Sequence, residues 1–185
     1  MVLSGQGTHQ HLVDTLAVKV HDLETPAVPF HHVAGGRQAA EQALALRDLE
    51  QALQLDPGQN QTRVLLAISY LRQNMFAEAS KTADEWLDDK ELAVLGYNIK
   101  AYAAMLQQKF DDADALLLKA HEAAADHPFT LLLEASLAAA RDDLPKAKQL
   151  LIKSMDMYPG YIPALQQYFG LTVKDDGGAD ALDAR

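Results

Sequence analysis

An alanine recurs every 34 residues along most of this chain, at Ala45, Ala79, Ala113 and Ala147. The last three copies also share neighbours: a bulky residue stands three positions before each, and a further alanine stands twelve positions before. These neighbours are Phe76, Phe110 and Leu144, and Ala67, Ala101 and Ala135. A fixed period of this length, with small residues at paired places, is typical of stacked helix–turn–helix units. It predicts an all-α chain in which the alanines mark close helix crossings.

This pattern resembles the tetratricopeptide repeat of bacterial type, over roughly residues 37–170. The resemblance implies an α-solenoid of about three full repeats plus capping helices. We expect full units over about 60–90, 91–125 and 128–159, with the second helix of the first of these reaching Leu87. Before them, a helix from about Arg37 to Leu55 would be half a unit, with Ala45, Leu49 and Ala52 on one face. After them, a helix over about 162–171 would cover the open end of the stack.

Three segments follow from this assignment. Residues 1–36 form an N-terminal arm, with a possible short helix over 11–24 and a Pro/Gly linker over 25–36. Residues 37–171 form the repeat domain, and residues 172–185 are predicted to be a disordered acidic tail. Inside the repeats, Asn74 lies in the turn between two helices, where asparagine tolerates a left-handed backbone.

Composition narrows the class of partner. The formal charge is −10 and no basic run occurs, which argues against nucleic acid because that affinity depends on clustered Lys and Arg. No apolar stretch is long enough for direct membrane insertion, and cysteine is absent. The first residues lack the features of a secretory signal. We therefore expect a cytoplasmic protein, or a periplasmic one if the sequence is a piece without its signal peptide.

The resemblance implies a partner-binding groove on the concave side, lined by the first helix of each unit. Its residues would be Val64, Ile68, Leu71, Arg72, Asn98, Tyr102, Met105, Leu106, Leu132, Ser136 and Ala139. The family members that hold a chaperone's terminal carboxylate use lysines and asparagines on these faces. Here Val64 and Ile68 stand where polar residues are needed and only Asn98 fits, so that subtype is rejected.

The predicted function is a non-enzymatic scaffold or adaptor whose partner is a protein or peptide with an amphipathic or hydrophobic segment. No catalytic residue and no cofactor are predicted. An alternative occupant of the groove is the chain's own N-terminal arm, and the two occupants are equally favoured. The apolar residues of that arm are Leu12, Leu16, Val20, Leu23, Val28 and Phe30.

Two other functions remain open. Five of the seven histidines precede residue 33, so His9 and His11 could bind a metal ion together with His31 or His32. Alternatively, the chain is a structural segment of a longer repeat array in a bacterial envelope or secretion assembly. Its ends would then stack on neighbouring units or on another copy, giving a homo-oligomer.

Overall fold

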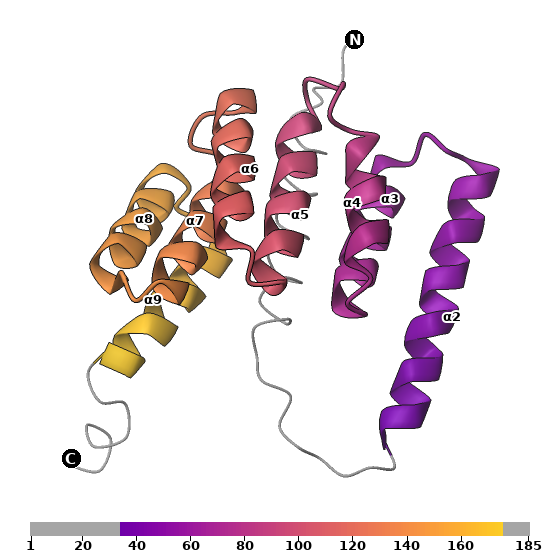
Figure 1. Cartoon of the computed structure of the whole chain (residues 1–185), viewed down its shortest axis with the longest axis horizontal. Coiled ribbons are helices and arrows are strands. Elements are labelled where there is room, and N and C mark those ends of the chain that lie inside the picture. Colours follow the sequence, from indigo (N-terminus) through magenta and orange to yellow (C-terminus); the bar gives the residue numbers. More distant parts are fainter. Residues whose placement is uncertain (1–33, 176–185) are drawn as a thin grey trace.

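The computed structural model describes residues 34–175, and every regular element in that range is an α-helix. Figure 1 shows the helices standing side by side in a row, with α2 at one end and α9 at the other. Their bounds are α2 Ala34–Leu55, α3 Asn60–Arg72, α4 Phe76–Asp84, α5 Ala93–Leu106, α6 Phe110–Ala123, α7 Pro128–Ala140, α8 Leu144–Met157 and α9 Ile162–Asp175.

The helices form three antiparallel pairs, α3/α4, α5/α6 and α7/α8, in a tetratricopeptide-like α-solenoid. The second helices α4, α6 and α8 begin at Phe76, Phe110 and Leu144, which are one period apart. Each packs against the first helix of its own unit and the first helix of the next unit. The predicted fold class is therefore confirmed.

The repeated alanines lie where these helices cross. Ala79, Ala113 and Ala147 on the second helices have no exposed surface. The same is true of the alanines on the first helices, Ala67, Ala101 and Ala135. A side chain no larger than a methyl group lets two helix backbones approach closely, so one position per helix fixes the stacking distance.

Ala45 differs from the other three copies because it is exposed to solvent. The predicted face of α2, with Ala45 beside Leu49 and Ala52, is wrong in this respect. The helix packs on α3 instead through the buried Leu46 and the half-buried Leu49 and Leu53. Since α2 has no first helix of its own in the described part of the chain, no close crossing requires a small residue at position 45.

The turn inside each unit repeats as regularly as the helices. Asn74, Gln108 and Asp142 are one period apart and have positive φ angles of 58°, 58° and 61°. The amide of the following residue donates to a carbonyl five residues back: Met75 to Tyr70, Lys109 to Ala104 and Asp143 to Ala138, each at 2.9 Å. This is the hydrogen-bond pattern of a Schellman C-cap, which satisfies carbonyls that the helix end leaves without partners.

Three helix ends differ from the predicted boundaries. Helix α2 begins at Ala34 and includes two glycines of the predicted linker, and α9 continues four residues past 171 into the predicted tail. Glycine costs least in the first turn, where amides donate no intrahelical bond. Helix α4 ends at Asp84, before Leu87, because the amides of Trp86 and Leu87 donate to the carbonyls three residues back, of Ala83 and Asp84, in place of those four back. The remaining residues of the arm and tail lie outside the described range.

Substituting Ala113→Leu would overfill the crossing between the second helix and its neighbours. We expect it to lower the free energy of unfolding by about 1–3 kcal/mol in urea denaturation. The matched control is Ala115→Leu on the same helix, at an exposed position, which should change that free energy by less than about 0.5 kcal/mol. Equal stability of the two variants would show that Ala113 is not a tight contact.

Substituting Gln108→Gly would relieve the left-handed backbone at residue 108. A non-glycine residue is disfavoured there, so we expect about 1 kcal/mol more stability in the same assay. Gln107→Gly is the control, because Gln107 has φ −88° and its side-chain amide donates to the Ala103 carbonyl. That variant should be less stable than the parent, and a gain at both positions would contradict the explanation.

Candidate functional site

The predicted groove residues occupy equivalent places on α3, α5 and α7, because they recur one period apart. Their exposure in the structure falls into three groups. Val64, Ile68, Leu71, Asn98, Tyr102 and Leu132 are buried; Met105, Ser136 and Ala139 are half-buried; Arg72 and Leu106 are exposed. Residues near the C-terminal ends of the first helices are thus the most accessible part of the predicted surface.

Asn98 bridges two units. Its side-chain amide lies 3.0 Å and 3.2 Å from the Thr130 hydroxyl, as donor and acceptor respectively, and neither residue has exposed surface. This contact joins α5 to α7 along the row of first helices. The one groove residue with the chemistry of a carboxylate clamp therefore has its amide directed at a neighbouring helix in this structure. Sequence reasoning missed Thr130, although it is a lone polar residue in the apolar run 128–133.

Helix α9 continues the row of first helices. It begins at Ile162, one period after α7 begins at Pro128. The side-chain amide of Gln167 donates to the Ser136 hydroxyl at 2.7 Å, so α9 touches a predicted groove residue. From the sequence, this helix is predicted only as a cap, and Gln167 is not among the predicted groove residues. The one-period spacing of the helix starts is the signal that would have found it.

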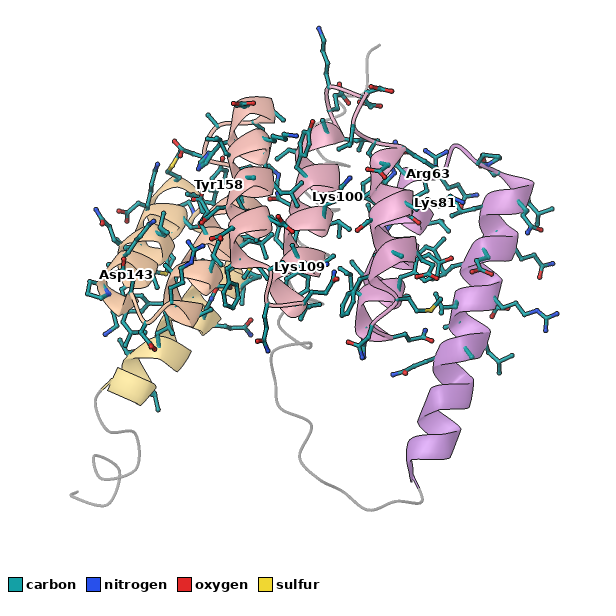
Figure 2. All side chains as sticks on the ribbon, in the orientation of Figure 1. Arg63, Lys81, Lys100, Lys109, Asp143 and Tyr158 are labelled. Atoms are coloured by element: carbon teal, nitrogen blue, oxygen red, sulfur yellow. The ribbon has the colours of Figure 1, made fainter. Side chains whose placement is uncertain are left out.

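Ion pairs link helices elsewhere in the array, and Figure 2 labels two of the basic residues that form them, Arg63 and Lys100. Lys100 on α5 pairs with Asp84 at the end of α4, and Arg63 on α3 lies 3.9 Å from the Glu85 carboxylate. His121 on α6 lies 2.9 Å from the Glu134 carboxylate on α7. Burial raises the pKa of Glu134, although the neighbouring His121 acts in the opposite direction. The ion pairs of Lys100 and His121 join successive units, the pair of Arg63 lies within one unit, and none of these residues belongs to the predicted groove.

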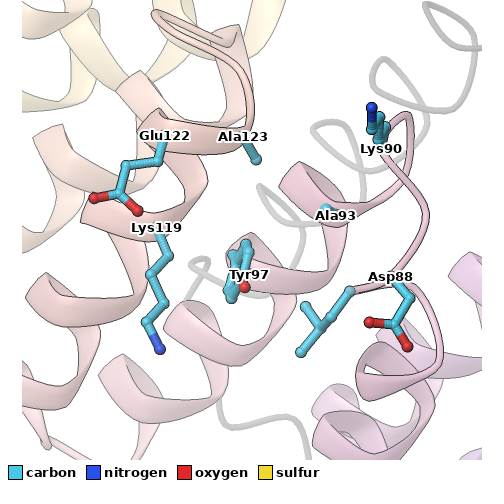
Figure 3. Close-up of a pocket in the computed structure, with 8 residues that line it drawn as sticks. Asp88, Lys90, Ala93, Tyr97, Lys119, Glu122 and Ala123 are labelled. Atoms are coloured by element: carbon cyan, nitrogen blue, oxygen red, sulfur yellow. The ribbon is translucent and has the colours of Figure 1, made fainter.

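An open pocket of about 410 Å³ lies between α6 and the connection from α4 to α5. Figure 3 shows Tyr97 and Lys119 in this pocket, and the Lys119 ammonium is 5.9 Å from the centre of the Tyr97 ring. Asp88 and Glu122 offset the charges of Lys90 and Lys119 on its walls. None of the predicted groove residues lines this pocket. Its balanced charges give it no marked preference for an anion or a cation.

The metal-binding alternative rests on His9, His11, His31 and His32, which all lie outside the described residues. Within the described part of the chain, no group of three or more His, Cys, Asp or Glu side chains is placed to hold a metal ion. The helices of the same part are also too short or too polar to cross a membrane.

Comparison with known proteins gives remote structural similarities. No family model and no curated protein matches the chain. Among solved structures, MamA is 18% identical, with 82% of this chain and 88% of that chain covered and a TM-score of 0.48. YrrB, described as a TPR protein with an unusual peptide-binding site, is 17% identical, with 83% and 96% covered and a TM-score of 0.38. Similarities this low do not say what this chain binds.

Substituting Asn98→Leu would leave the buried Thr130 hydroxyl without its amide partner. We expect a loss of about 1–3 kcal/mol in the free energy of unfolding. Adding Thr130→Val removes the orphaned hydroxyl as well, so the double variant should be more stable than the sum of the two single changes predicts. A double-mutant cycle in urea measures this coupling, and a coupling energy of zero would contradict the bridge.

Proposed function

We propose that this chain is a protein-interaction scaffold that holds an apolar or amphipathic segment of a partner protein against α3, α5 and α7. The observation that supports this most directly is the chemistry of the predicted groove. Eight of its eleven residues are apolar or aromatic, and they repeat at equivalent places on three successive helices. An apolar row of this kind suits the apolar face of an amphipathic helix, which binds in hydrophobic grooves.

The accessible end of this row gives the proposed site its specificity. Leu106 is 40% exposed, and Met105 beside it is half-buried with a flexible side chain that adapts to different apolar shapes. Arg72 is exposed at the equivalent end of α3. A guanidinium there favours a partner segment that carries a carboxylate next to its apolar residues. We infer that the partner enters the groove from this side.

The test uses amphipathic helical peptides selected by display on the full chain and then titrated by fluorescence anisotropy. Leu106→Asp places a charge in the proposed groove and should weaken binding at least about tenfold, because an apolar contact is lost and a charge is desolvated. Circular dichroism checks that each variant keeps its helix content.

The matched control is Leu118→Asp, which makes the same chemical change at another exposed leucine, on α6. Since α6 is a second helix, this variant should bind the peptides within about twofold of the parent. If the selected peptides are equally sensitive to both substitutions, or to Leu118→Asp alone, they bind outside the groove and the proposal fails.

A further inference from the structure

The central part of the predicted groove is shielded from water. Ile68, Tyr102 and Leu132 lie on three successive first helices and are 1%, 3% and 4% exposed. Among the helices between residues 34 and 175, the main packing contacts join each helix to the adjoining helix in sequence or to the next first helix. None of them crosses the groove from α3 to α7.

We propose that the N-terminal arm of the same chain, residues 11–30, occupies the groove. Of the two segments outside the described range, only this one has a suitable apolar stripe: Leu12, Leu16, Val20 and Leu23 recur at helical spacing, and Phe30 follows. Residues 176–185 contain three aspartates and a single large apolar residue, Leu182. An apolar segment in an apolar groove removes both surfaces from water.

The arm is long enough to reach. Helix α2 packs on α3 through Leu46, Leu49 and Leu53, and it begins at Ala34, twelve residues or about 18 Å before Leu46, a distance that the linker has to cover first. Residues 25–33 can span up to about 30 Å when extended. Neighbouring packed helices lie about 8–10 Å apart, so the row from α3 to α7 spans roughly 20 Å. Residues 11–24 would cover about 20 Å as a helix, which equals that distance.

This assignment deepens the proposed function. The arm acts as a built-in ligand, and a partner segment has to displace it to reach the same residues. Only this consequence rests on the proposed function, because the position of the arm is tested without any partner.

The experiment measures the rate at which a maleimide labels a single cysteine in the full chain, which has none of its own. Leu132→Cys reports on the groove. In the parent background we expect slow labelling, and the added pair Leu16→Glu and Val20→Glu, which breaks the apolar stripe of the arm, should accelerate it at least about tenfold. An unchanged rate would overturn the proposal.

Two controls make this result specific. Val18→Glu and His21→Glu add the same number of glutamates on the opposite side of a helical projection of the arm, and should leave the rate within about twofold. Ala135→Cys on the same helix α7 has no exposed surface and lies at a helix crossing. It should stay protected in every background. If Ala135→Cys accelerates together with Leu132→Cys, the array itself has opened.

A second measurement keeps the apolar stripe of the arm intact. It therefore locates the arm even if the glutamate substitutions open the whole array. A spin label at Gln10→Cys should broaden the amide signals of Tyr102 and Leu132 by paramagnetic relaxation in a dilute sample. No broadening would overturn the proposal. Broadening that appears only when spin-labelled and isotope-labelled molecules are mixed would also overturn it, because the occupant would then be the arm of a second copy.

Discussion

The architecture depends on how closely helices approach at the repeated alanines. A second helix such as α6 is held between two first helices, and Ala113 is fully buried at that place. A methyl group there keeps the helix axes near the short end of the usual 8–10 Å range. Because the same crossing recurs after every period, successive first helices are set at similar distances. Residues one period apart then fall into rows, and the predicted groove is one such row. The spacing of the predicted binding surface is therefore a consequence of the alanine contacts and not a separate feature.

The period in the sequence predicts crossings only where a neighbouring helix exists to form them. Ala79, Ala113 and Ala147 are buried as predicted, whereas Ala45 has the same phase and is exposed. The period shows which residue type occupies each position, but a residue is buried only where another helix packs against it. The predicted boundaries are inaccurate for a related reason. The glycines at 35 and 36 disfavour a helix only weakly, by about 1 kcal/mol each relative to alanine, and the chain continues helical through them.

At the candidate site, too, the sequence predicts the position of a residue in the repeat but not what surrounds its side chain. The period placed the groove residues at equivalent points of the first helices, and the structure keeps that register. The period could not predict the hydrogen bond between Asn98 and Thr130. These two residues belong to different units and stand at non-equivalent places in the repeat. Nor could the period give the burial of Tyr102 or Leu132. Helical periodicity identifies the face on which a side chain lies, whereas its exposure depends on what packs against that face.

The proposed occupant is tethered to the array, and the tether alters the apparent affinity of the predicted groove for a partner. A flexible connection of some ten residues keeps a ligand at an effective concentration on the order of millimolar. If the arm binds with an intrinsic dissociation constant of the same order, the groove is empty about half of the time, and a partner loses only about twofold in apparent affinity. A hundredfold tighter arm would reduce that affinity by about a hundredfold. Evolution of the arm alone could therefore tune partner binding without changing the groove. The composition of residues 11–30 favours an intermediate strength, since charged residues such as Asp14, Lys19 and Asp22 alternate with the apolar ones along the sequence. In a helical projection of the sequence, Asp14 lies opposite the stripe and Lys19 and Asp22 lie beside it, so they limit the apolar area that the arm can bury.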